Sequence, residues 1–156
     1  MRIRPAIGRA AQQKPVLAAC LAALTVLTSC SGGGITDTVS TAVEDSSSAI
    51  ATARLALRQD SAGKLTRAAT STALDDALKE LTASRDSVLR LAPSTAADRA
   101  AVHEALTVLD GCTASLATAR DAVASDDGIP SLPDGDRDLA AAADRLSALT
   151  AMEGGK

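Results

Sequence analysis

The sequence predicts an all-α domain, built as an antiparallel up-down helical bundle of three long helices plus a shorter C-terminal helix. Apolar residues recur every three or four positions through four segments, which is the period of a helix. No segment shows the strict apolar–polar alternation of a half-buried strand. Short links join the first three segments, so neighbouring helices are expected to run antiparallel.

The first two helices are expected over 37–60 and 66–92. Asp37 is a suitable N-cap for the first helix, and Ser61-Ala62-Gly63 should end it. The second should end before Pro93, because proline cannot continue a helix. Their predicted core faces are Val39, Val43, Ile50, Ala53 and Leu57 in the first helix, and Leu74, Leu78, Leu81, Val88 and Leu89 in the second.

The third helix is expected over 95–125, and the fourth over 136–152 after a loop at 126–136 that is rich in Asp, Gly and Pro. Gly111 could break the third helix, but continuity is the favoured interpretation. Asp134 or Asp136 is expected to cap the fourth helix. The predicted core faces are Val102, Leu106, Leu109, Leu116 and Val123 in the third helix, and Leu139, Ala143, Leu146 and Thr150 in the fourth.

Residues 1–29 have the character of a targeting segment. Four basic residues precede an apolar run over 16–27, which is the order found in a secretory signal. The run is too short to span a bilayer, which takes about 20 apolar residues. It ends in Leu27-Thr28-Ser29-Cys30, and Ser31-Gly32-Gly33-Gly34 follows.

This ending resembles the lipobox of bacterial lipoproteins, in which an aliphatic residue and two small residues precede an obligatory cysteine. The resemblance implies that the Cys30 thiol carries a diacylglyceryl group and that the chain is cleaved between Ser29 and Cys30. It also implies anchoring on the extracytoplasmic face of the cell membrane, since two acyl chains anchor a protein stably. Residues 30–36 would then form a tether and 37–153 the bundle. In the alternative, an ordinary cleaved signal or an uncleaved anchor, Cys30 is incidental.

The composition excludes several classes of function. With no aromatic residue, the chain cannot build stacking platforms for single-stranded nucleic acid. With one histidine, it cannot build a multi-histidine metal site. Loss of the signal would leave 12 basic against 19 acidic residues, which argues against nucleic-acid binding. We therefore expect no metal, no cofactor and no nucleic-acid partner.

Two arginines, Arg85 and Arg120, fall within predicted apolar faces. A buried charge needs a partner, or its side chain must reach out to solvent. Arg120 is expected level with the end of the first helix, so we predict an Arg120–Asp60 ion pair, helped by the negative C-terminus of that helix. The functional alternative is an anion pocket between helices.

The remaining candidates favour structural interpretations. His103 and Cys112 lie nine residues apart, on opposite sides of a continuous helix, so they cannot share a metal. We expect His103 to be solvated rather than part of a relay with Thr107 and Asp110. Cys112 is expected to be a packed thiol, with a reactive or disulfide-forming thiol as the alternative. The acidic loop lacks EF-hand spacing, so helix capping is favoured over calcium binding.

These features together predict a lipid-anchored, non-enzymatic module that contacts an envelope protein at the membrane surface. A second hypothesis is a carrier of an apolar or anionic small molecule, with Ser46, Thr113 and Arg85 as polar groups in its cavity. A third is a structural spacer of the cell envelope.

Overall fold

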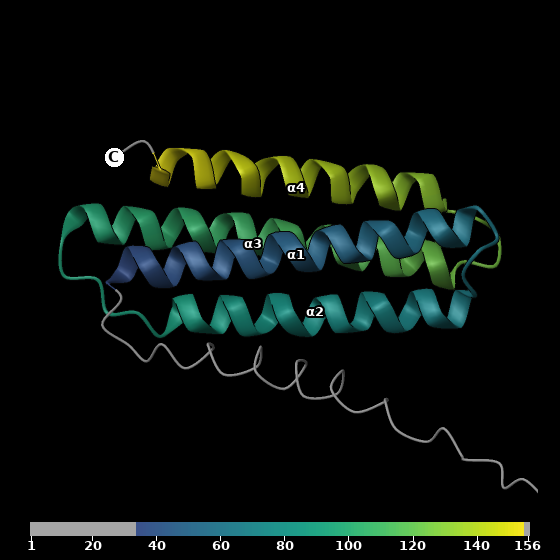
Figure 1. Ribbon diagram of the computed structural model, residues 1–156, viewed down its shortest axis with the longest axis horizontal. Coiled ribbons are helices and arrows are strands. Elements are labelled where there is room, and N and C mark those ends of the chain that lie inside the picture. The colour runs from purple at the N-terminus through teal and green to yellow at the C-terminus, as the bar shows by residue number, and fades with distance from the viewer. Residues whose placement is uncertain (1–33, 155–156) are drawn as a thin grey trace, which may run out of the picture. The chain divides into compact units, whose positions relative to one another are not determined.

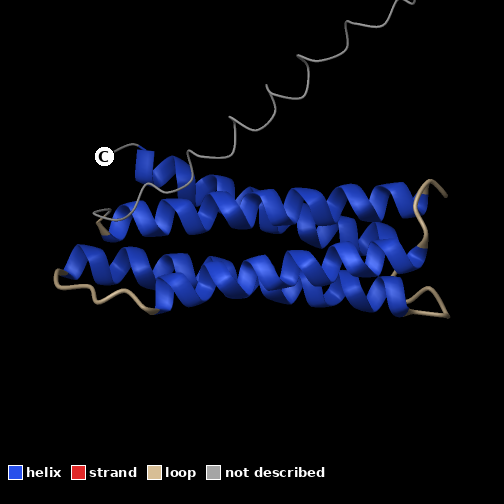
Figure 2. Cartoon of the chain, turned by 60° about the horizontal axis from the view of Figure 1, so that its bottom comes forward, coloured by secondary structure: helices blue, strands red, loops and turns tan. Residues whose placement is uncertain are grey.

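A computed structural model describes residues 34–154, all of which belong to four helices and their connections. The helices are α1 (Ile35–Ser61), α2 (Arg67–Leu89), α3 (Ala96–Ala124) and α4 (Leu132–Gly154), shown in Figure 1. No strand occurs within this described part (Figure 2). The predicted all-α class is therefore confirmed, and α3 runs through Gly111 without a break.

α1 and α3 contact each other at the centre of the bundle. Each of these two also contacts both α2 and α4, whereas α2 and α4 do not touch. Ion pairs show how the helices run relative to each other in two pairs of neighbouring helices. Between α2 and α3, Arg85 pairs with Asp110 and Arg120 with Asp75, so numbers rise on one helix as they fall on the other. Near the end of α1, Arg54 pairs with Asp136 near the start of α4.

The core is built from leucine, valine and alanine, and most of the predicted faces are buried. Four of the predicted residues are only partly buried against this core, namely Leu78, Val102, Leu106 and Ala143, and two more are exposed. Leu89 is half-exposed, and Thr150 is exposed while Leu149 is buried in its place. The two fully buried hydroxyl residues have partners, since Ser46 Oγ donates to the Ala42 carbonyl at 2.6 Å and Thr70 Oγ1 to the Thr66 carbonyl at 3.1 Å. These bonds avoid the cost of an unsatisfied buried polar group.

The expected shorter fourth helix is wrong, because α4 has 23 residues, as many as α2. It begins four residues early, after Ser131. The Asp134 N–H donates to Ser131 Oγ, and the Ser131 N–H donates to the Asp134 carboxylate, each at 3.3 Å. This is a capping box in which serine is the cap, so neither Asp134 nor Asp136 is the N-cap. Pro133 is tolerated because it lies in the first turn. Asp37 does not cap α1 either, since Gly34 is the N-cap.

Gly135 marks a close approach of α4 to α3 rather than a loop. A Cβ at this position would lie 3.1 Å from the Cα of Ala119, closer than an ordinary van der Waals contact. The lack of a side chain thus lets the two backbones approach. At Gly111 a Cβ would meet only the Arg145 guanidinium, at 3.4 Å.

The two helical glycines are expected to respond in opposite ways to alanine. Gly111→Ala should stabilise the domain by up to about 1 kcal/mol, because alanine is the better helix former and the Arg145 side chain can move. Gly135→Ala should destabilise it, since overpacking against a backbone costs about 1–3 kcal/mol. Urea unfolding followed by circular dichroism measures both. Stabilisation by Gly135→Ala would contradict the close approach.

Candidate functional site

The predicted lipidation and cleavage site, Ser29 and Cys30, lies outside the described residues and stays a prediction. The described chain begins at Gly34. We call this end of the bundle the proximal end; it includes residues 90–95 and the C-terminus of α4 (Figure 1). The distal end holds the α1–α2 turn at 62–66 and the α3–α4 loop at 125–131.

The distal loop at 125–131 presents an apolar side chain to solvent. Ile129 is 78% exposed, the most of any large hydrophobic residue in the described chain. The backbone beneath it is held, because the Ile129 N–H donates to Ser125 Oγ at 2.8 Å and to Asp127 Oδ1 at 3.1 Å. Ser125 Oγ also donates to Asp127 Oδ1 at 2.6 Å, and these bonds lower the pKa of Asp127. The backbone of Ile129 is therefore held next to the Asp127 carboxylate, and Asp126 and Asp127 of the same loop are both exposed.

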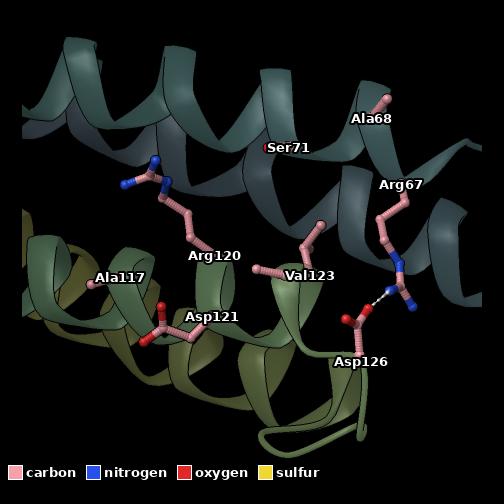
Figure 3. Close-up of a pocket in the computed structure, with 9 residues that line it drawn as sticks. Arg67, Ala68, Ser71, Ala117, Arg120, Asp121, Val123 and Asp126 are labelled. Atoms are coloured by element: carbon pink, nitrogen blue, oxygen red, sulfur yellow. Dashed lines mark ion pairs between the residues drawn. The ribbon is translucent and has the colours of Figure 1, made fainter.

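A groove of about 530 Å³ runs between α2 and α3 near the distal end (Figure 3). Its charged lining residues are Arg67, Arg120, Asp121 and Asp126. The Arg67 guanidinium donates to the Ser125 carbonyl at 3.4 Å and lies 3.9 Å from the Asp126 carboxylate. Figure 3 shows that the two guanidiniums do not converge on one point. The groove therefore lacks the arrangement of an anion pocket.

The predicted Arg120–Asp60 pair is wrong. Arg120 Nη2 instead lies 2.8 Å from Asp75 Oδ1, and both side chains are nearly half exposed. The register of α3 against α2 places position 120 beside position 75, and the long side chain reaches out of the core to solvent. Asp60 Oδ2 is buried and has no hydrogen-bond partner among the described residues. Arg85 also reaches the surface, where it pairs with Asp110 at 2.6 Å.

Replacing Arg120 by methionine is expected to change the free energy of unfolding by less than about 1 kcal/mol, because an exposed ion pair contributes little. The thermal midpoint, followed by circular dichroism, should stay close to that of the parent. A loss of several kcal/mol would show that the charge is buried and paired.

The acidic residues around the start of α4 have structural partners. The Asp136 carboxylate accepts from Arg54 Nε at 3.0 Å and from Arg58 Nε at 3.2 Å, and it joins α4 to α1. The Asp134 carboxylate accepts from Ser131 and Arg137, and these bonds lower its pKa. Across residues 34–154, no group of three His, Cys, Asp or Glu side chains could hold a metal ion.

His103 and Cys112 lie on opposite sides of α3, as predicted. His103 is exposed, while Cys112 is fully buried in the core, with Sγ 4.0 Å from the Ala142 carbonyl oxygen. Burial raises the pKa of the Cys112 thiol from 9.0 to about 11. The thiol is thus neutral and inaccessible at physiological pH, which favours the packed interpretation over the reactive one.

The raised pKa of Cys112 predicts a loss of stability at high pH. Between about pH 9 and pH 11 the unfolded thiol is ionised while the folded thiol keeps its proton, so stability falls as pH rises through this window. We expect a loss of about 2 kcal/mol across it. Urea unfolding at a series of pH values measures this, and Cys112→Ala is the control. An equal loss in the control would assign the effect to other groups.

Comparison with known proteins found no family model, no curated protein and no solved structure that matches this chain. Among the described helices, none is both long and apolar enough to span a membrane. The exposure of Ile129 was not predicted, although an isoleucine within a run of Asp, Gly and Pro was a signal for it.

Proposed function

We propose that this chain is a bacterial lipoprotein, anchored through Cys30 on the extracytoplasmic face of the cell membrane. Its helical domain is an up-down antiparallel bundle that acts without catalysis, as an interaction module for an envelope protein. The lipobox supports the anchor. The observation that carries the interaction role is Ile129, which is held out to solvent at the end of the bundle farthest from the tether.

In the proposed geometry, the lipid anchor and the partner contact lie at opposite ends of the bundle. α1 has 27 residues and is about 40 Å long at 1.5 Å per residue. A bundle tethered at its proximal end would present the distal loop about that far from its attachment. Ile129 stands beside Asp126 and Asp127, so a complementary partner has an apolar recess with a basic rim. Such a recess would bury the isoleucine, which is worth about 1.5–3 kcal/mol.

Site-specific crosslinking in living cells tests this role. A photoreactive residue replaces Asp126, beside Ile129, and mass spectrometry identifies the peptide joined to it. We expect one envelope protein, joined at a peptide that contains Lys or Arg beside apolar residues. The adduct should disappear in an Ile129→Ser variant and when Cys30→Ala removes the anchor. A photoreactive residue at Leu55, exposed on α1, is the matched control site. The same adducts from both sites would contradict a distal contact.

The groove between α2 and α3 favours a second candidate, a small-molecule carrier. Its volume of about 530 Å³ is in the range of ligand sites. The polar residues that the sequence suggested for a cavity do not line it, since Ser46 is bonded within α1, Thr113 within α3, and Arg85 pairs with Asp110. Native mass spectrometry of the protein extracted from membranes tests this candidate. A retained small molecule that is lost in Arg120→Ala would support it, and a clean apo mass would count against it.

A further inference from the structure

The proximal end carries two of the four large hydrophobic side chains that are exposed in the described chain. Leu89, the last residue of α2, is 49% exposed, and Met152, near the end of α4, is 50% exposed. Of the other two, Leu55 lies along α1 and Ile129 lies at the distal tip. Both side chains therefore lie at helix ends on the proximal side of the bundle, which makes that end a candidate surface of contact.

Two arginines at the same end are not engaged by carboxylates. Arg90 Nη2 donates to Ser87 Oγ at 3.2 Å, and Arg99 Nη1 donates to the Ser94 carbonyl at 3.1 Å. Neither has a carboxylate within 4 Å among the described residues. By contrast, six of the seven other described arginines form ion pairs, namely Arg54, Arg58, Arg67, Arg85, Arg120 and Arg137. The seventh, Arg145, lies away from the proximal end, beside Gly111 of α3. An arginine whose donors are free suits the oxygens of a phosphate.

We propose that the proximal end of the bundle rests directly on a phospholipid bilayer. Leu89 and Met152 enter the interfacial region, and Arg90 and Arg99 bind the phosphates of anionic headgroups. This inference rests on the proposed lipid at Cys30. Because α1 begins at Ile35, the part of the tether between Cys30 and the bundle is Ser31 to Gly34. These four residues reach at most about 14 Å, so they hold this end close to the surface.

Carboxylates at the proximal end partly offset the positive charge of Arg90 and Arg99. Asp98 is committed to the cap of α3, where it accepts from the Thr95 N–H at 3.3 Å, and Asp37 lies in the first turn of α1. Asp86 lies one turn inside the end of α2. At a distance, these negative charges offset the positive charge of Arg90 and Arg99. The preference for anionic lipid therefore depends on direct contact between the two guanidiniums and the lipid phosphates.

The absence of aromatic residues makes a direct test possible, since one introduced tryptophan is the only fluorophore in the chain. The lipidated full-length mature protein is reconstituted in vesicles of phosphatidylglycerol and phosphatidylcholine with brominated acyl chains, which quench tryptophan at contact. Leu89→Trp reports on the proximal end, and Ile129→Trp, equally a surface hydrophobic, is the matched control at the distal end. We expect quenched and blue-shifted emission from position 89 and solvent-like, unquenched emission from position 129.

Charge variants then test the headgroup contact. Arg90→Gln and Arg99→Gln are each added to the Leu89→Trp protein. Each should lower the ratio of bundles that rest on the bilayer to bundles that do not by about fivefold. Arg137→Gln, whose arginine is paired at the other end of α4, should leave it unchanged. In vesicles of phosphatidylcholine alone, where choline offsets the charge of each phosphate, the effect of Arg90→Gln and Arg99→Gln should be smaller.

Two results would overturn the proposal, and they are distinguishable. If the protein floats with the vesicles but position 89 is as unquenched as position 129, the bundle is anchored without resting on the bilayer. If the wild-type protein fails to float with the vesicles, the lipid anchor itself is absent, and the proposed function fails with it.

Discussion

Replacing Leu116 by alanine should cost the domain about 2–5 kcal/mol of unfolding free energy, the range for removing a fully buried leucine. Leu116 is completely buried in α3, and α3 contacts all three other helices. The core has no aromatic side chain and much alanine, so each leucine supplies a large share of the buried apolar surface. Since domains of this size are stable by only about 5–15 kcal/mol, the variant should be close to unfolding.

Chemical unfolding in urea, followed by circular dichroism, measures this loss. Leu55→Ala is the matched control, because Leu55 is also on a helix but is 57% exposed. Its free energy of unfolding should change by no more than about 0.5 kcal/mol. Similar losses at the two positions would show that the leucine side of α3 does not form the core.

Replacing Cys30 by alanine should abolish both the lipid anchor and the cleavage before residue 30. Burial of two acyl chains contributes about 0.8 kcal/mol per CH₂ group, far more than any surface contact of the bundle. Without the thiol there is no group to acylate, and cleavage before residue 30 should also fail. Fractionation of cells, followed by a mass measurement of the chain, detects both changes.

Cys20 offers a control within the same segment. It lies in the apolar run before the lipobox, and Cys20→Ala keeps that run apolar. This variant should be cleaved and anchored like the parent. If Cys30→Ala remains cleaved at the same bond and membrane-bound, the resemblance to lipoproteins is misleading and Cys30 is incidental.

The helices were largely predictable because their apolar residues follow the helical period over more than twenty residues each. α1, α2 and α3 begin and end within three residues of the predicted bounds. The start of α4 was missed because Pro133 and Gly135 are typical of loops. In the structure, Pro133 occupies a first turn, where its missing N–H costs nothing, and Gly135 permits the close approach to Ala119.

Contacts between helices were harder to predict than the helices themselves. The partner of Arg120 depends on how far α3 slides along α2, and no local pattern encodes that register. Arg120 also faces α2, where it meets Asp75, rather than α1, where Asp60 lies. The arginines at the proximal end could not be distinguished from the others by sequence, because the distinction is which of them find a carboxylate once the helices are packed.

The mass of the intact protein extracted from the membrane fraction tests the central claim most directly. The account predicts a polypeptide that begins at Cys30 and carries the added mass of a diacylglyceryl group on that residue. Fragmentation should place the whole addition on the first residue. A chain that begins elsewhere, or one that begins at Cys30 without added lipid, would contradict the anchor and the membrane-surface role built on it.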